Sequence, residues 1–254
     1  MVKKPIVAGN WKMHKETLEG VNFVENVQSK FSSIFNVTVI FSPPYTALFQ
    51  IKVQSPFFKS AQNCHWEKKG AFTGEISTSM IKSSGAEYVI SGHSERREFF
   101  GDTDKIVNKK NRAIIKENLK PIFCIGETLD QRESGKTQEI LNYQISEGLK
   151  DIDTIDEMII AYEPVWAIGT GMTATIEQIE ETHSYIKNLI ESKYNLKDDI
   201  QVLYGGSVNP NNAEELINVS NVDGFLIGGA SLDVDTFASI IKIVEDNQEK
   251  NNNG

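Results

Sequence analysis

The stretch MIIAYEPVWAIGTG, residues 158–171, combines a short apolar run, a charged residue at its end and a glycine-containing loop. The apolar residues 158–161 predict a strand that is covered on both faces. The strand ends at Glu163, because Pro164 has no N–H group to donate to a sheet. A helical pattern begins at about Ile176. This order is what a base beneath a movable loop needs, although strand-end glutamates are mostly solvated and glycine-rich loops are mostly plain connections.

Similar short apolar runs recur along the whole chain, and amphipathic helical patterns separate them. Together with the opening stretch, the predicted strands are Ile6–Asn10, Val37–Ser42, Lys59–Asn63, Tyr88–His93, Pro121–Gly126, Met158–Glu163, Ile200–Gly206 and Asp223–Gly228. Most are apolar on consecutive residues, as expected of parallel strands. These eight units predict an α/β fold, a single (β/α)8 TIM barrel of eight parallel strands over residues 1–254, with a doubly wound open sheet as the rival.

Three of the intervening helices have a clear apolar stripe. The first, at about residues 17–31, has its stripe at Leu18, Val21, Val24, Val27 and Phe31. The second, at about 176–190, includes His183 in its stripe, so we expect this histidine to pack rather than to bind a ligand. The last helix has Phe237, Ile240, Ile241 and Val244 on one side, and we expect the polar tail 247–254 to fray.

Composition excludes several classes of protein. The chain has 254 residues and a net charge of −9, which argues against nucleic acid or an anionic membrane as a partner. No apolar run approaches the roughly 18 residues of a membrane span, and the run near the N-terminus is too short for a signal peptide. Cys64 and Cys124 are far apart and form no metal-binding pattern, which fits a reduced, cytoplasmic protein without a metal.

Polar and glycine residues stand where the predicted strands end. They are Gly9-Asn10-Trp11-Lys12, Gln62-Asn63, Gly92-His93-Ser94-Glu95-Arg96-Arg97, Glu163, Tyr204-Gly205-Gly206-Ser207 and Gly228-Gly229-Ala230-Ser231. Each has an ordinary explanation when taken singly, as a solvated side chain or a tight turn. In a barrel, however, the carboxyl ends of all strands open on one face, where active sites lie. The pattern therefore places a lysine, a histidine and a glutamate round one rim, beside two glycine-rich turns.

These residue types suggest a particular chemistry. Glu163 could act as a general base if burial raises its pKa. Lys12 offers a positive charge for a phosphate or a developing oxyanion. The glycine-rich turns can present backbone N–H groups to phosphate oxygens. His93 precedes a segment that could open a short helix, and because a helix N-terminus disfavours a cation, we expect a neutral imidazole that donates a hydrogen bond.

The strand-end segments together resemble the triosephosphate isomerases. The resemblance is carried by residues 9–13, 61–64, 70–75, 92–97, 124–128, 161–171, 204–208 and 224–231, and it extends from about Ile6 to Ile243. It implies interconversion of dihydroxyacetone phosphate and D-glyceraldehyde 3-phosphate, in glycolysis and gluconeogenesis, without a cofactor or a metal. The expected partners are the small-molecule substrate and a second copy of the chain in a homodimer.

The resemblance also implies roles, position by position. Glu163 removes a proton from one carbon and returns it to the next, and His93 moves protons between the oxygens of the enediol(ate). Lys12 stabilises negative charge, Asn10 supports the oxyanion side, and Glu95 orients Lys12. The remaining substrate contacts are implied at Gly169, Thr170, Ser207, Gly228 and Gly229, and an apolar clamp on the base at Ile168 and Leu226.

Two loops receive further expectations from the resemblance. A closing lid is implied at 164–174, where Met172 stands in place of the usual lysine and so bears on the rate of lid opening. His14, where asparagine is usual, is a departure outside the catalytic set. The long segment 62–79 is expected to carry Thr73 to the active-site rim of a partner subunit.

Other interpretations are weaker. Residues 134–137 read SGKT, like the end of a phosphate-binding P-loop, but Asp130 occupies the position of its first glycine. Residues 169–174 fit a dinucleotide-binding pattern, yet the preceding strand ends too early for a tight turn. The rival functions are another phosphate-binding barrel enzyme, such as an aldolase that uses a lysine Schiff base, and a catalytically silent barrel that acts as a surface binding protein.

Overall fold

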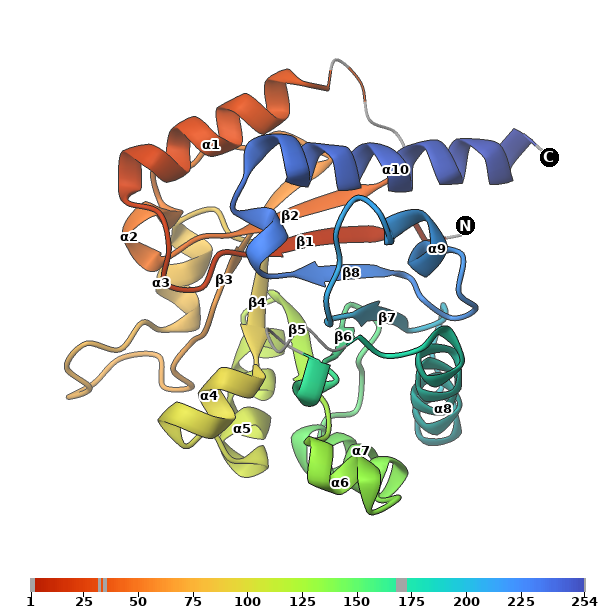
Figure 1. The fold of residues 1–254 in the computed structure, drawn as a ribbon. Helices are drawn as coiled ribbons and strands as arrows, with labels where there is room; N and C mark the ends of the chain where they lie inside the picture. The colour runs from red at the N-terminus through yellow and green to blue at the C-terminus, as the bar shows by residue number, and fades with distance from the viewer. Residues whose placement is uncertain (1–2, 32, 34–35, 168–172, 254) are drawn as a thin grey trace.

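The computed structural model describes residues 3–31, 33, 36–167 and 173–253. Eight parallel strands close into a barrel in the order in which they occur in the chain, with the first strand paired to the last (Figure 1). The strands are β1 Ile6–Asn10, β2 Thr38–Ser42, β3 Phe57–Ala61, β4 Tyr88–Ser91, β5 Lys120–Ile125, β6 Ile159–Tyr162, β7 Gln201–Tyr204 and β8 Gly224–Ile227. The predicted closed barrel is confirmed, and the open sheet is excluded because Ile6 pairs with Gly224.

Helices follow the strands and form the outer layer of the molecule (Figure 1). They are α1 Thr17–Ser29, α2 Tyr45–Leu48, α3 Thr78–Ser83, α4 Ser94–Phe100, α5 Asp104–Lys116, α6 Leu129–Glu133, α7 Thr137–Gly148, α8 Ile176–Lys193, α9 Ala213–Ile217 and α10 Val234–Asn253. Two short 3-10 helices, η1 Val165–Ala167 and η2 Gly229–Ser231, follow β6 and β8.

Several predicted strands extend too far toward the rim. β4, β6, β7 and β8 end before the residues His93, Glu163, Gly205 and Gly228, and β3 lies two residues earlier than expected. The chain leaves the sheet there for identifiable reasons: Gly92 takes φ +69° after β4, and Pro164 lacks a donor after β6. His93, Glu163, Gly205 and Gly228 therefore lie at the start of the loops, whereas Asn10 is the last residue of β1.

One expectation about the helices is wrong. Leu18 is 72% exposed, and the buried face of α1 is formed instead by Gly20, Phe23, Val24 and Val27. Gly20 belongs to this face because a β-carbon there would lie 3.0 Å from the ring of Trp11.

The last helix extends into the polar tail, through contacts with the region of α9. α10 stays helical through Asn253 because α9 supports it: Asn247 is buried and donates to Asn218 Oδ1 at 2.9 Å, and Lys250 contacts Glu214 at 3.1 Å.

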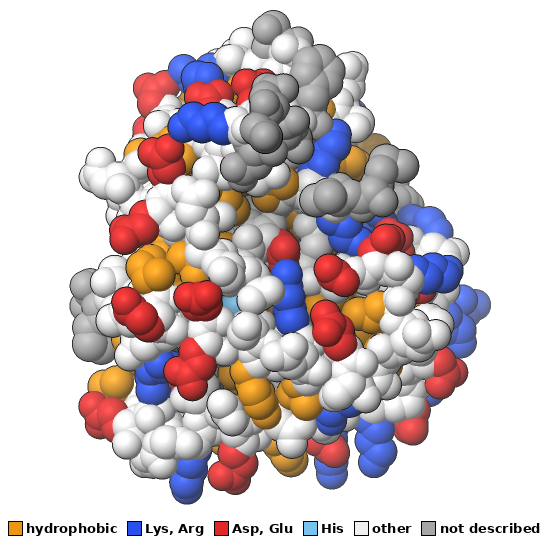
Figure 2. Space-filling model, turned by 90° about the vertical axis from the view of Figure 1, so that its right-hand side faces the viewer, with side chains coloured by type: hydrophobic (Ala, Val, Ile, Leu, Met, Phe, Trp, Pro, Cys, Tyr) orange, Lys and Arg blue, Asp and Glu red, His pale blue; other side chains and the backbone are white. Residues whose placement is uncertain are grey.

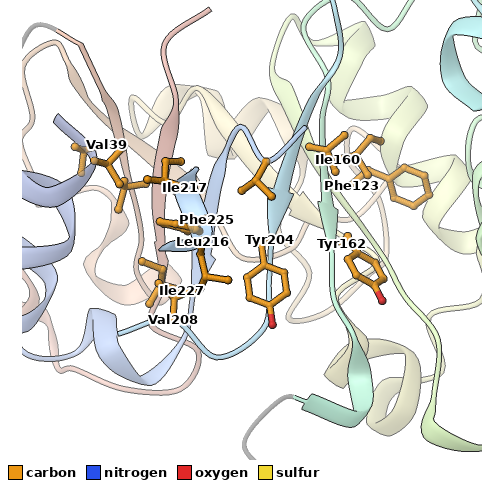
Figure 3. Close-up of a cluster of buried hydrophobic side chains, with 14 of the residues drawn as sticks. Val39, Phe123, Ile160, Tyr162, Tyr204, Val208, Leu216, Ile217, Phe225 and Ile227 are labelled. Atoms are coloured by element: carbon orange, nitrogen blue, oxygen red, sulfur yellow. The ribbon is translucent and has the colours of Figure 1, made fainter. Parts of the chain in front are cut away.

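Successive side chains of each strand point to opposite faces of the sheet, and this alternation divides the core into two layers. One cluster faces the barrel axis and includes Ala8, Ile90, Ala161 and Leu226. The other lies between the sheet and the helices and includes Val39, Phe123, Ile160, Tyr162, Tyr204, Phe225 and Ile227 (Figure 3). Since side chains alternate, the residues two positions beyond the inward-facing ones also point toward the axis at the mouth. This places Asn10, Glu163 and Gly228 round the opening.

The opposite end of the barrel carries charge of both signs. Figure 2 shows the molecule from the right-hand side of Figure 1. The arrows of β1 and β8 point away from this side, so it is the end of the barrel at which these strands begin. Lysine, arginine, aspartate and glutamate side chains are intermixed across this face. Within the part of the chain that the structure describes, none of the helices has the length and apolar character required to cross a bilayer.

His183 makes stability depend on pH. It is fully buried beneath Tyr162 and Tyr204, and its Nδ1 lies 3.0 Å from the carbonyl oxygen of Asn221, so Nδ1 carries the proton of the neutral ring. Burial lowers the pKa of His183 to about 4. Between this value and the ordinary value of about 6.5, the unfolded chain binds the proton more strongly than the native protein does. Stability is therefore lost as the pH falls through this window.

We expect the free energy of unfolding to decrease by about 2–3 kcal/mol between pH 7 and pH 4.5 through His183 alone. Urea unfolding at the two pH values measures the change, and His183→Gln separates it from the contribution of the carboxylates. Equal pH dependence in the variant and the parent would contradict this account.

Candidate active site

The strand-end residues surround a cavity of about 330 Å³ at the carboxyl mouth of the barrel. Its lining residues are Asn10, Lys12, His93, Glu163, Gly205, Gly206, Ser207, Val208, Asn209, Leu226, Ile227, Gly228, Gly229 and Ala230. The fold thus brings together residues from the loops after five strands. Ile168, Gly169, Thr170 and Met172, which the sequence also singled out, lie outside the described residues.

Glu163 and His93 form the buried centre of this cavity. Glu163 Oε1 lies 2.9 Å from His93 Nε2, and the two side chains are 3% and 7% exposed. The second oxygen, Oε2, accepts a hydrogen bond of 3.0 Å from the backbone N–H of Ser94. His93 caps the N-terminus of α4, where its Nδ1 accepts from the N–H of Glu95 at 3.2 Å. An Nδ1 that accepts cannot carry a proton, so the ring is the neutral Nε2–H tautomer.

The charges of this pair are coupled. Burial raises the pKa of Glu163, but the interaction with His93 and the hydrogen bond from the Ser94 N–H lower it more, so the net shift is downward. Burial lowers the pKa of His93, while the carboxylates of Glu163 and Glu95 raise it, with an upward result. The rise in the Glu163 pKa expected from burial is therefore not met in this arrangement. The N–H of Glu95 still favours the neutral ring, because it occupies the position that a second imidazole proton would need.

Lys12 is held from two sides. Its Nζ lies 2.6 Å from Glu95 Oε1, which is the contact expected of Glu95. Its backbone N–H donates to Asn10 Oδ1 at 3.1 Å, and its carbonyl accepts from Gln62 Nε2 at 2.8 Å. Gln62 also donates to Ser42 O at 2.9 Å, so it ties the loop of Lys12 to the end of β2. The sequence placed Gln62 on the rim but gave it no role; its amide becomes a support only when β1, β2 and β3 lie side by side.

The two glycine-rich turns complete the cavity. A β-carbon at Gly205 would lie 2.9 Å from Glu163 Cγ, so this glycine leaves room for the carboxylate side chain. At Gly228 a β-carbon would lie 3.4 Å from Lys12 Cε, while at Gly229 it would meet nothing within 4 Å. Ser207 Oγ donates to Ala167 O at 3.4 Å, which connects the turn after β7 to η1. Lys12 therefore passes across Gly228, next to an open backbone at Gly229.

Glu127 supports the segment that follows Glu163, and the sequence prediction missed it. This carboxylate is fully buried, and its Oε1 accepts from Arg132 at 2.9 Å, Tyr162 Oη at 3.1 Å and Trp166 Nε1 at 3.1 Å. The available signal was a carboxylate directly after an apolar strand with an arginine five residues later. Because Trp166 belongs to η1, the contact fixes the start of the segment that leads away from the base.

A larger hollow of about 490 Å³ lies elsewhere, along α5. It is lined by both cations, such as Lys109 and Arg112, and anions, such as Asp151 and Asp153. It contains none of the strand-end residues. Size therefore does not locate the site, whereas the convergence of a buried carboxylate, an imidazole and an ammonium group does.

The fold and the cavity define an α/β-barrel protein with a buried carboxylate, an imidazole and an ammonium group at the carboxyl mouth of the barrel. A family model described as triosephosphate isomerase matches residues 5–244. The chain belongs to the triosephosphate isomerase family and is an isomerase by class.

Individual relatives are similar to this chain over nearly its whole length. The triosephosphate isomerase of Endomicrobium trichonymphae is 45% identical over 248 residues, which cover 95% of this chain and 99% of the relative. That of Acetivibrio thermocellus is 47% identical over 249 residues, with coverages of 95% and 99%. The crystal structure of triosephosphate isomerase from Bartonella henselae superimposes with a TM-score of 0.86 at 36% identity, covering 95% of this chain and 99% of that chain.

Proposed function

We propose that this chain interconverts dihydroxyacetone phosphate and D-glyceraldehyde 3-phosphate through an enediol(ate), in glycolysis and gluconeogenesis. Glu163 carries the proton between the two carbons, and His93 carries protons between the two oxygens. Lys12 and Asn10 stabilise the negative charge that develops on oxygen. The observation that supports this assignment is the contact of Glu163 Oε1 with His93 Nε2 at 2.9 Å, in a cavity that also contains the Lys12 ammonium group.

The two ends of the substrate need different surroundings. A neutral Nε2–H of His93 can donate to a carbonyl or enediol oxygen and take the proton back, which a permanently charged group could not do as readily. We assign the phosphate to the backbone N–H groups of Gly228 and Gly229 and to Ser207, with Gly169 and Thr170 as further contacts. Leu226, which lines the cavity, and Ile168 would form the apolar clamp on Glu163. The reaction proposed here uses no cofactor.

A coupled assay with D-glyceraldehyde 3-phosphate tests the function. We expect turnover that a phosphoglycolate-type inhibitor suppresses. Covalent trapping of a lysine by borohydride in the presence of substrate would favour an aldolase instead. Purified protein without turnover would favour a silent barrel that serves as a binding protein.

His93 also sets the pH range in which Glu163 is ionised. Because burial is the largest influence on Glu163 and His93 opposes it, His93→Gln should raise the pKa of Glu163. Glu163 acts as a base only above its pKa, so we expect the acid limb of kcat/KM to move to higher pH in this variant. The pH–rate profiles of variant and parent give the shift. An acid limb that stayed in place would mean that His93 does not hold the carboxylate in its ionised form.

We further propose that the chain works as a single domain in a cytoplasmic homodimer. Apolar side chains are exposed on the segments that follow β1, β2 and β3: Met13 is 94%, Phe49 65%, Met80 53% and Phe72 43% exposed. A second hollow of about 290 Å³, lined by Asn10, Lys12 and Glu95, opens beside the active site, and Thr73 of a partner subunit could reach it. Both cysteines are free and buried, as suits a reduced compartment. Sedimentation equilibrium measures the oligomeric state.

A further inference from the structure

Lys15 connects the loop that carries Lys12 with the loop that follows β8. Its Nζ donates to the carbonyl oxygen of Leu232 at 2.8 Å. The same ammonium group pairs with Glu19 Oε1 at 3.3 Å, in the first turn of α1. Lys15 is therefore bonded both to the helix after β1 and to the end of η2, although 217 residues separate it from Leu232.

The position of the Lys15 side chain is closely determined. Nζ lies 4.4 Å from the centroid of the Phe23 ring and 5.7 Å from that of Trp11, two buried aromatic residues. The side chain is only 7% exposed. Its backbone adopts φ +71°, a left-handed conformation that a lysine rarely takes. The left-handed backbone and the burial of the ammonium group both cost free energy. The contacts of Nζ with the two aromatic rings and with Leu232 O offset this cost.

The carbonyl that Lys15 binds belongs to Leu232, the residue directly after the short helix η2. The two residues that flank this helix are bonded to it or across it: Leu232 N–H donates to Gly229 O at 3.0 Å, and Ser231 Oγ donates to Gly228 O at 2.7 Å. A displacement of Leu232 is thus passed directly to Gly228 and Gly229. Lys12 Cε also passes close to Gly228. The position of the loop after β8 therefore sets the distance between the Lys12 ammonium group and the backbone of Gly228 and Gly229.

We propose that Lys15 is a positioning residue that holds the Gly228–Gly229 backbone in register with the phosphate group of the substrate. This inference rests on the proposed function, because that function places the phosphate at this turn. Lys15 does not line the cavity and does not touch substrate; it acts through Leu232 and η2. The reacting carbons are handled by Glu163 and His93, whose contacts do not involve Lys15.

The test compares substrates with and without a phosphate group. Lys15→Met keeps the aliphatic stem and removes the donor, and Lys15→Arg keeps a cationic donor. Lys30→Met is the matched control, because it makes the same change of charge at the end of α1, where Lys30 pairs with Asp235 at the start of α10 rather than, among the described hydrogen bonds and ion pairs, with the region of η2. The readouts are KM and kcat for D-glyceraldehyde 3-phosphate, the Kd of inorganic phosphate, and deuterium exchange into D-glyceraldehyde.

In Lys15→Met, we expect the KM for the phosphorylated substrate and the Kd of inorganic phosphate to rise together by roughly three- to tenfold. Exchange into D-glyceraldehyde should stay within about twofold, since loss of a binding contact for the phosphate leaves the proton chemistry intact. Lys15→Arg should recover most of the affinity, and Lys30→Met should resemble the parent.

Two results would overturn the inference. One is unchanged binding of inorganic phosphate in Lys15→Met. The other is an equal loss with both substrates, which would show that Lys15 only supports the barrel as a whole. If the parent protein showed no isomerase turnover, the proposed function would fall separately, and phosphate binding by parent and variant would still decide the role of Lys15.

Discussion

Replacing Glu163 with glutamine is expected to reduce kcat by about 10²- to 10⁴-fold, the range that a positioned general base contributes. The side chain is 3% exposed and has two donors aimed at it, the N–H of Ser94 and Nε2–H of His93. Glutamine preserves the size of the side chain but cannot take a proton from carbon. Steady-state kinetics with D-glyceraldehyde 3-phosphate measures the loss, and inorganic phosphate should still bind because its proposed site lies at the turns after β7 and β8.

The matched control is Glu157→Gln. Glu157 is also a glutamate beside β6, but it lies before the strand begins, pairs with Lys120 at 2.7 Å and is 69% exposed. We expect it to retain normal kcat. Glu163→Asp tests distance rather than charge: a retraction of about 1 Å should cost on the order of 10²-fold in rate. Full activity in either Glu163 variant would show that another group is the base.

Lys12→Met is expected to lower kcat/KM by about 10²- to 10³-fold, as the loss of a positioned group that stabilises an oxyanion does. The ammonium group neutralises Glu95, which lies 2.6 Å away. Without Lys12, that carboxylate would stand uncompensated beside an anionic substrate. The effect therefore has two parts, the loss of an attraction and the gain of a repulsion.

A double variant separates the two parts. Lys12→Met with Glu95→Gln should regain some of the lost kcat/KM, because the unpaired carboxylate is gone. Lys242→Met on the outer helix α10 controls for the change in net charge, since Lys242 pairs only with Asp246 among the contacts described, at 2.8 Å. A Lys12→Met protein that kept kcat/KM within about tenfold of the parent would contradict the electrostatic role of Lys12.

Much of the fold could be predicted because local patterns determine it. Each strand is a short apolar run, each long helix has a stripe, and eight such units have few ways to cover both faces of a parallel sheet. Errors occurred where long-range contacts decide. Leu18 fits the helical stripe but is exposed, since Trp11 packs against Gly20 instead.

For the candidate site too, some residues could be found from local sequence patterns and others only from long-range contacts. Lys12, His93 and Glu163 could be found because reactive residue types follow predicted strands, and a barrel brings strand ends to one rim. Gln62, Glu127 and Lys15 could not be assigned roles, because an amide, a carboxylate or an ammonium group gives no local sign of a partner far along the chain. Their partners, such as Leu232 for Lys15, become neighbours only when the barrel closes.

By itself, then, the sequence determined the barrel, its family and the candidate residues at the barrel mouth, since the alternation of side chains and residue type are local properties of the chain. The tertiary structure decided the protonation and support of those residues. The N–H of Glu95 makes His93 the Nε2–H tautomer, and His93 with Ser94 holds Glu163 ionised despite its burial. The physical reason is that charge and hydrogen bonding act over a few ångströms in space, and only the closed barrel determines which groups lie within that distance.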